Sequence, residues 1–141
     1  MHHAAIGAAV LLAAEAAAAE QLTLYSLATG DRFVELGQDG GAGNMTLWNS
    51  AIQDEQGNRL GTGAGVCIRL DAAGHHMCNL VIDHDGHGTI NVSGVQVAEP
   101  ATATLTIIGG TGEYQGATGT VESTPVEDRA RFKYEIDYRT D

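Results

Sequence analysis

The sequence predicts an all-β protein, either a sandwich or a closed barrel. After Glu20 the apolar residues recur mostly with period two, which is typical of half-buried strands. Nineteen glycines against two prolines indicate many turns between short strands. A closed barrel would leave no exposed strand edge. Polar residues inside a strand, such as Asn91 and Ser93, also favour a barrel whose interior holds something.

The first half of the chain contains the early strands and a flexible loop. Residues 22–27 alternate as a first strand, and residues 45–52 form a second. Between them, four glycines and an asparagine over residues 37–44 predict a flexible loop. Gln56, Gly57 and Asn58 follow the second strand and predict a turn.

The second half supplies six more strands, giving eight in all. We expect them at about 65–71, 76–83, 88–98, 101–109, 118–124 and 129–139. The last is the clearest, because Phe132, Tyr134, Ile136 and Tyr138 alternate with charged residues. Its aromatic face either packs in the interior or forms a ligand cage. No repeat or second domain is evident, so residues 20–141 are expected to form one domain.

The N-terminal segment resembles a removable secretory leader. An apolar run over residues 4–14 precedes Ala17-Ala18-Ala19, the small-residue pattern of a cleavage site. The basic n-region is missing and Glu15 interrupts the segment, so an alanine-rich helix is the alternative. We expect residues 1–19 to be a signal peptide and the protein to be secreted or periplasmic.

The net negative charge of the chain disfavours anionic binding partners. Seven Lys and Arg against eighteen Asp and Glu give a net charge of −11. A phosphate backbone or an anionic bilayer surface would be repelled, so we expect no nucleic-acid and no membrane partner.

The two cysteines allow a derivation from strand register. If residues 66–70 and 75–82 form a hairpin around the loop 71–74, Cys67 lies opposite Cys78. Directly opposed Cβ atoms lie about 4.5–5.5 Å apart, and closer at non-hydrogen-bonded pairs. A Cys67–Cys78 disulfide therefore fits if this is a non-hydrogen-bonded pair. The alternative is two buried thiols that pack as small hydrophobes.

The histidines do not predict a metal centre. Asp83-His84-Asp85-Gly86-His87 has suitable composition, but adjacent strand residues point to opposite faces. We expect a turn there and no metal. His75 and His76 flank the proposed hairpin loop and are expected to face solvent.

The glycine-rich stretch 109–119 is not expected to bind a nucleotide. A phosphate-binding loop must open a helix, whereas residues 120–125 are β-prone and end in proline. The stretch instead resembles the strand–turn–strand signature of dirigent proteins and allene oxide cyclases. Residues 59–67, with Gly65 before Cys67, and residues 85–94 resemble two further blocks of allene oxide cyclases. The resemblance implies an eight-stranded antiparallel β-barrel without a cofactor, and the trimers of the family suggest a homo-oligomer, a dimer or a trimer.

The resemblance can be followed residue by residue. Allene oxide cyclases carry a Glu and an Asn on the first strand, where this chain has Ser26 and Ala28. Their second-strand Asn falls near Asn49 or Ser50, and a pocket Tyr falls near Val95 or Gln96; the match to Cys67 lines their pocket. Dirigent proteins use acidic residues and an Arg inside the barrel, for which Arg69, Asp71 and Asp83 are candidates. Dirigent proteins also tie the two barrel ends with their disulfide, unlike the pairing expected here.

Because the matching carboxylate is absent, allene oxide cyclisation itself is not predicted. We expect a barrel that binds an apolar small molecule in its lumen and steers its cyclisation or coupling, an isomerase- or cyclase-type activity if it is an enzyme. The alternatives are a non-catalytic carrier and a structural barrel with a filled interior. The candidate lining residues are Trp48 (in preference to Leu47), Asn49, Cys67, Tyr114, Tyr134 and Tyr138.

Overall fold

The computed structural model describes residues 18–97 and 102–140, which contain eight strands and two single-turn 3-10 helices. Residues 1–17, most of the expected leader 1–19, lie outside this part, so the predicted signal peptide stays a prediction. The elements are β1 (Glu20–Val34), η1 (Asp39–Gly41), β2 (Met45–Gln53), β3 (Arg59–Arg69), β4 (His75–His84), β5 (Gly88–Val97), β6 (Ala103–Gly110), η2 (Gly112–Tyr114), β7 (Thr118–Val126) and β8 (Arg131–Arg139).

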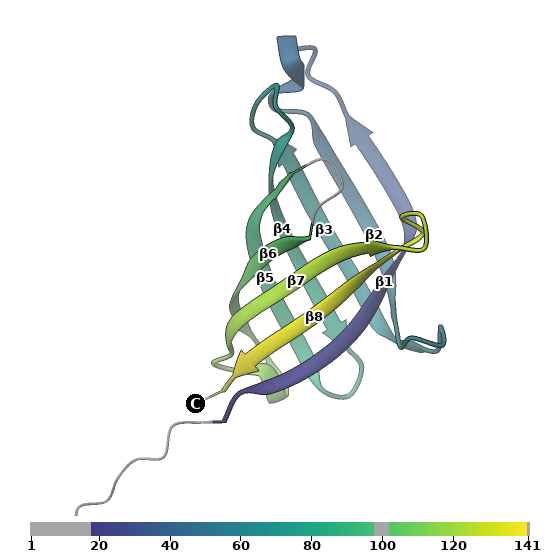
Figure 1. Cartoon of the computed structure of the whole chain (residues 1–141), viewed down its shortest axis with the longest axis vertical. Helices are drawn as coiled ribbons and strands as arrows, with labels where there is room; N and C mark the ends of the chain where they lie inside the picture. The colour runs from purple at the N-terminus through teal and green to yellow at the C-terminus, as the bar shows by residue number, and fades with distance from the viewer. Residues whose placement is uncertain (1–17, 98–101, 141) are drawn as a thin grey trace, which may run out of the picture.

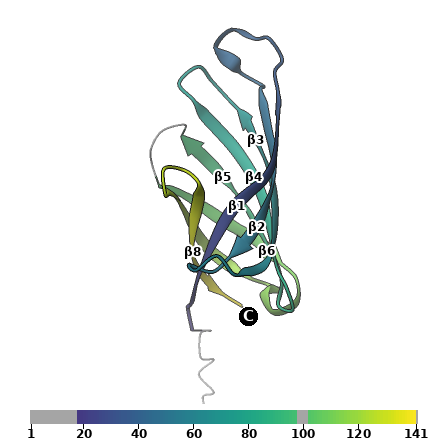
Figure 2. The same ribbon diagram turned by 90° about the vertical axis from the view of Figure 1, so that its right-hand side faces the viewer.

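The strands form a closed antiparallel barrel, as predicted. Each strand pairs with the next in the chain, and β8 pairs with β1 to close the sheet (Figures 1 and 2). The choice between sandwich and barrel is thereby settled, because a sandwich would leave β1 and β8 with free edges. No helix in the described part is long and apolar enough to cross a membrane.

β3 begins six residues earlier than predicted. Its first half carries glycines at alternate positions, and these face the barrel interior. A Cβ on Gly63 would lie 2.5 Å from Ser50 Oγ, and one on Gly65 would lie 2.3 Å from Trp48 Cζ2. Glycine is depleted in β-strands, so the glycines of residues 61–65 did not predict a strand. In the barrel these inward positions must be small, which is why glycine occupies them.

The packed core fills one end of the barrel. Leu24, Ile52, Ile82, Ile90 and Leu105 are fully buried there, and Val92, Ile107, Val121 and Ile136 are nearly so. These side chains come from seven different strands and meet in the lumen. This end is the one at which the C-terminus and η2 lie in Figure 1. Asn91 and Ser93, expected to line the interior, instead alternate with the buried Ile90 and Val92 and point outward.

The glycine-rich stretch joins two strands, as the sequence predicted. η2 is a single turn between β6 and β7, so no helix N-terminus faces the loop. Gly112 has φ +62°, and a Cβ there would lie 2.5 Å from the His87 carbonyl oxygen. This close approach lets the turn at 85–87 pack beside η2, where Glu113 N–H donates to the same carbonyl over 2.7 Å.

The predicted disulfide is present. Cys67 on β3 lies directly opposite Cys78 on β4, and their sulfurs are bonded. The register around them is the one derived from the sequence, with Ile68 opposite Met77 and Arg69 opposite His76. The bond joins adjacent strands of one hairpin, unlike the dirigent pattern.

Candidate functional site: a lumenal cavity at the end opposite the core

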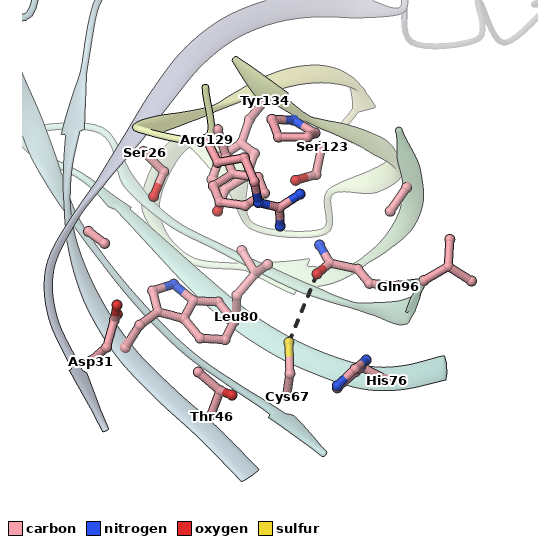
Figure 3. A pocket seen from close by; sticks show the side chains of 16 residues that line it. Ser26, Asp31, Thr46, Cys67, His76, Leu80, Gln96, Ser123, Arg129 and Tyr134 are labelled. Carbon is pink, nitrogen blue, oxygen red and sulfur yellow. Dashed lines mark hydrogen bonds between the residues drawn. The ribbon is translucent and has the colours of Figure 1, made fainter. Parts of the chain in front are cut away.

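The end of the barrel opposite the packed core contains a cavity of about 420 Å³ (Figure 3). Its walls come mainly from the second half of the odd-numbered strands and the first half of the even-numbered ones, with Arg129 added from the turn between β7 and β8. In an up-and-down barrel these segments all meet at the same end. The cavity is therefore a pocket in the lumen and not a cleft between surface loops.

The cavity exists because inward-facing side chains shrink along the strands. On β1 the inward series is Leu22, Leu24, Ser26 and Ala28, and the last two line the cavity. β6 shows the same change between Leu105 in the core and Ala103 at the cavity. The lumen of an eight-stranded barrel is just wide enough for side chains to fill, so small inward residues leave space for a ligand.

Trp48 supplies the largest flat surface of the cavity wall. Its indole lies over Gly65 of the neighbouring strand, where no side chain could be accommodated. Because the indole is rigid, this contact fixes the ring against the wall. An aromatic face held in this way can stack on a flat apolar ligand.

Buried hydroxyl groups provide the polar part of the wall. Tyr134 on β8 and Ser26 on β1 are 5% and 4% exposed. Burial raises the pKa of Tyr134, and the Ser26 hydroxyl lowers it less. The Tyr134 hydroxyl is therefore protonated at neutral pH and can donate. Ser123 of β7 adds a third buried hydroxyl to the wall.

His76 and Gln96 line the wall near the disulfide. His76 Nδ1 lies 2.8 Å from the Gly74 carbonyl oxygen. Because a carbonyl only accepts, Nδ1 carries the proton and Nε2 of the neutral ring is an acceptor. Gln96 Oε1 lies 3.6 Å from Cys78 Sγ and 4.0 Å from Cys67 Sγ, a contact drawn in Figure 3. The expectation that His76 faces solvent is therefore wrong, because strand alternation directs its side chain into the barrel.

Charged residues lie at the exposed rim of the cavity. Asp31 and Arg129 line it, and both are exposed. Arg129 closes a run of three left-handed residues, Glu127, Asp128 and Arg129, with φ of 54°, 53° and 69°. Such conformations cost of order 1 kcal/mol or more each and occur often at functional sites. The Arg129 guanidinium lies 5.8 Å from the centre of the Phe132 ring, another wall residue.

Arg131 secures this strained turn to the barrel. Its guanidinium binds both carboxylate oxygens of Glu127 and donates to the carbonyls of Asp54 and Glu55 over 3.1 Å each. It also lies 4.4 Å from the centre of the Tyr25 ring on the outer face of β1. The hydrogen bond from Arg131 is the main reason that the pKa of Glu127 is lowered.

Three of the six candidate residues meet at the cavity. Trp48, Cys67 and Tyr134 all line it, from β2, β3 and β8. Asn49 is exposed and lies outside the lining, because it alternates with Trp48 along β2. Trp48 was preferred over Leu47 for the same reason, and Leu47 is 39% exposed.

Tyr114 and Tyr138 lie at the other end of the barrel, away from the cavity lining. Their rings meet edge to face at 5.4 Å between centres. The Tyr114 hydroxyl lies 2.7 Å from His84 Nδ1, and the His84 ring stacks on His87 at 4.0 Å. A hydrogen bond to Glu20, followed by burial, raises the pKa of Tyr138. These tyrosines close the core end.

The resemblance to allene oxide cyclases indicated some cavity-lining positions that could not be found from residue type alone. Ser26 and Ala28, at the matched first-strand positions, line the cavity, and so does Gln96. Their side chains are small or polar and uncharged, and such residue types do not by themselves indicate a binding site. The usable signal was their place on the inward face of a strand, two or four residues along from the buried Leu24 or Val92. Arg69 instead donates to the carbonyls of residues 71 and 72, outside the lining.

Solved structures with the same fold carry several activities. A pyocyanin demethylase is 24% identical with a TM-score of 0.75, covering 84% of this chain and 99% of its own. A pterocarpan synthase dirigent protein is 13% identical with a TM-score of 0.70, covering 90% and 99%. A Diels–Alderase from Streptomyces koyangensis is 18% identical with a TM-score of 0.69, covering 86% and 69%.

A comparison with curated proteins found no match. The family described as "Allene oxide cyclase barrel like domain" matches residues 21–137, which include nearly all of the barrel strands. The fold similarities, which cover 84–90% of this chain, agree with this match. The chain therefore belongs to the allene oxide cyclase barrel-like family.

Proposed function

We propose that this barrel binds a mainly apolar small molecule in its lumen and steers its ring closure or stereoselective coupling. The observation that carries the proposal is the cavity of about 420 Å³ with a few buried hydroxyls in its wall. Ligand pockets usually measure about 300–1,000 Å³ and combine apolar walls with a few polar groups. A filled barrel, the structural alternative, would have no such space.

The wall offers two functions that ring closure needs. The first is confinement, because a flexible molecule folded against Trp48 spends more time in a reactive conformer. The second is a hydrogen-bond donor at a developing negative charge, a role that the neutral Tyr134 hydroxyl can take. His76 Nε2 adds an acceptor that can receive a proton from a nucleophilic hydroxyl. All of these groups belong to the chain itself, and we expect no resident cofactor.

The similar structures support this class of chemistry. Two of them, a pterocarpan synthase dirigent protein and a Diels–Alderase, are named for reactions that build molecules on the same fold. The third is named a pyocyanin demethylase, after a small-molecule substrate. A fold hosts many functions, so the support lies in the combination of these activities with the cavity.

A carrier is the second candidate, and one observation favours it. In the described part of the chain, the carboxylate and the guanidinium that line the cavity, those of Asp31 and Arg129, are exposed at its rim. Apart from the His76 imidazole, the polar side chains of the deeper wall are hydroxyls and an amide. Such a wall can retain a ligand without changing it.

We also propose that the barrel works outside the cytoplasm, in the periplasm or secreted. The Cys67–Cys78 disulfide supports this location, because such bonds persist in oxidising compartments. Mass spectrometry of the protein from its own secreting host tests it. We expect a chain beginning at Glu20, and a chain retaining residues 1–19 in that fraction would contradict the proposal.

Binding in the lumen is tested with a matched pair of variants on β6. Ala103 is buried and lines the cavity, whereas Thr104 next to it is exposed on the outer face. We expect Nile red to bind the wild type with a blue-shifted emission. Ala103→Phe should abolish this binding, and Thr104→Phe should leave it unchanged. Equal binding by all three proteins would show that the dye, and the proposed ligand, does not use this cavity.

Turnover is tested with the ligand that co-purifies. Native and then denaturing mass spectrometry of the protein from its host identify a bound molecule. That molecule, or its open-chain precursor, is then incubated with one-hundredth of an equivalent of protein. More than one equivalent converted per protein supports catalysis. Saturable binding without conversion supports the carrier. Conversion that Ala103→Phe does not slow would contradict a lumenal reaction.

A further inference from the structure

The Cys67–Cys78 disulfide forms part of the cavity wall, and its two sulfurs differ in access. Cys67 lines the cavity and is 9% exposed, whereas Cys78 is fully buried and does not line it. The two cysteines belong to an inward-facing row that crosses four strands. Thr46 of β2 lies opposite Cys67, and Gly94 of β5 lies opposite Cys78. The two ends of the bond therefore have different surroundings.

The row determines which sulfur a molecule in the cavity can attack. A nucleophile that opens a disulfide approaches one sulfur in line with the bond, from the side away from the other sulfur. For Cys67 this side faces Thr46, a small residue that also lines the cavity. For Cys78 it faces Gly94, where the fully buried Leu105 packs so closely that a Cβ would lie 2.8 Å from its Cδ2. Of the two sulfurs, that of Cys67 is therefore the one open to attack.

Gln96 provides a hydrogen-bond acceptor for the sulfur that would leave. Its Oε1 lies 3.6 Å from Cys78 Sγ and 4.0 Å from Cys67 Sγ, the latter contact drawn in Figure 3. A disulfide sulfur has no hydrogen to donate, so this oxygen gains a thiol donor only after the bond opens. Opening also leaves β3 and β4 together, because the two strands are paired at residues on both sides of the cysteines.

From this arrangement we infer that the disulfide is a thiol–disulfide exchange site for small apolar dithiols held in the lumen. A thiolate of the ligand bonds to Cys67 Sγ as the Cys67–Cys78 bond breaks. The electron pair of that bond goes to Cys78 Sγ, which takes up a proton. The second thiolate of the ligand then attacks the ligand sulfur of the mixed disulfide, which closes a cyclic disulfide and releases Cys67 as a thiol. The ligand loses two electrons and the protein disulfide gains them, so one exchange needs no other oxidant.

The cavity selects the ligand by its apolar body. Trp48 and Leu80 line the cavity from β2 and β4, the strands that flank Cys67 on β3. A volume of about 420 Å³ has room for an aromatic ring beside the attacked sulfur. A dithiol is favoured over a monothiol, because ring closure by its second sulfur competes with re-formation of the protein disulfide. This activity uses the cavity but none of the hydroxyl groups of the proposed function, so the two can fail separately.

The rate of disulfide opening at pH 8 tests the inference. The apolar probe is 1,2-benzenedimethanethiol and the polar one is dithiothreitol, and both are uncharged dithiols that close cyclic disulfides of the same ring size. Maleimide labelling after an acid quench, followed by mass spectrometry, counts the free thiols of the protein. Each rate is divided by that of the same probe on oxidised glutathione. We expect the divided rate to be at least about tenfold higher for the apolar probe, because its ring is buried in the cavity.

Two variants inside the cavity and one outside it locate the reaction. Thr46→Phe should remove the preference for the apolar probe, because the new ring fills the approach to Cys67. Ala103→Phe, which fills the cavity from β6, should have the same effect. Leu47→Phe is the control and should keep the preference, because Leu47 follows Thr46 on β2 but is exposed on the outer face.

Three outcomes would overturn the inference. The first is a wild-type disulfide that shows no preference for the apolar probe, or that neither probe opens while the chain is folded. The second is an unchanged preference in both cavity variants, each shown folded by circular dichroism. The third is an equal loss of preference in Leu47→Phe. Nile red binding alongside any of these results would leave the proposed lumenal binding in place and remove only the exchange site.

Discussion

Reduction of the Cys67–Cys78 bond should lower the stability of the barrel by an amount that the loop length sets. The two cysteines are 11 residues apart in sequence. Closing a loop of this length removes unfolded-state entropy worth about 2.8 kcal/mol at 25 °C. A domain of about 120 residues unfolds with an entropy near 0.25 kcal/mol/K, so the expected fall in Tm is about 11 °C.

Thermal unfolding followed by circular dichroism, with and without a phosphine reductant, measures this fall. Reduction changes no side chain other than the two sulfurs, so the comparison isolates the cross-link. The Cys67→Ala/Cys78→Ala double variant is the control, and its Tm should not respond to the reductant. Mass spectrometry must show two added hydrogens in the reduced sample. A reduced wild type that retains its Tm within about 2 °C would refute the loop-closure reasoning.

Three more predictions concern single side chains. Gly65→Ala should destabilise the fold by about 1–3 kcal/mol and shift the emission of Trp48, because the new Cβ would displace the indole. Burial and the charge of a neighbouring histidine lower the pKa of His84. As the pH drops through about 6.5, the unfolded state therefore takes up this proton first, and the free energy of unfolding should fall. Unfolding in urea between pH 8 and 5 measures this fall, and His84→Gln should make the free energy of unfolding depend less on pH. Tyr134→Phe removes a buried hydroxyl that interacts with Ser26, which should cost about 1 kcal/mol, and it should weaken retention of the co-purified ligand.

A specific result would contradict each of these three predictions. Ala64→Val changes the outer face beside Gly65, and if it shifted the emission as much, the indole contact would not be the cause. The His84 prediction would be wrong if stability were flat or rose on acidification, since the pH range lies above the titration of Asp and Glu. Tyr25→Phe changes a buried tyrosine outside the cavity lining, and an equal loss of ligand there would remove the special role of Tyr134.

Local patterns were sufficient for the number of strands and for the disulfide register, but not for every strand end, since β1 continues to Val34 and β3 begins at Arg59. Cys67 lies opposite Cys78 because the hairpin loop length sets the pairing of every residue along the two strands. The aromatic alternation on β8 likewise placed Tyr134 on an inward face, since side chains alternate between faces with a period of two. Periodicity and turn chemistry act over a few residues, so a sequence reveals them directly.

The same patterns did not predict where along the barrel axis each inward-facing side chain lies. Tyr134 and Tyr138 share one face of β8, yet the first lines the cavity and the second closes the opposite end with Tyr114. His76 was expected to face solvent beside the hairpin loop, and it is part of the cavity wall. Asn49 seemed a pocket residue and is exposed.

The sequence by itself therefore determined the number of strands, their order, the register that places Cys67 opposite Cys78, and the family. Only the tertiary structure decided where the lumen is filled and where it is open, because that depends on inward side chains from all eight strands at one level of the barrel. Ser26, Ala103 and Ser123 are unremarkable one at a time. Closure of β8 on β1 brings them to one level, where their combined small volume leaves the cavity.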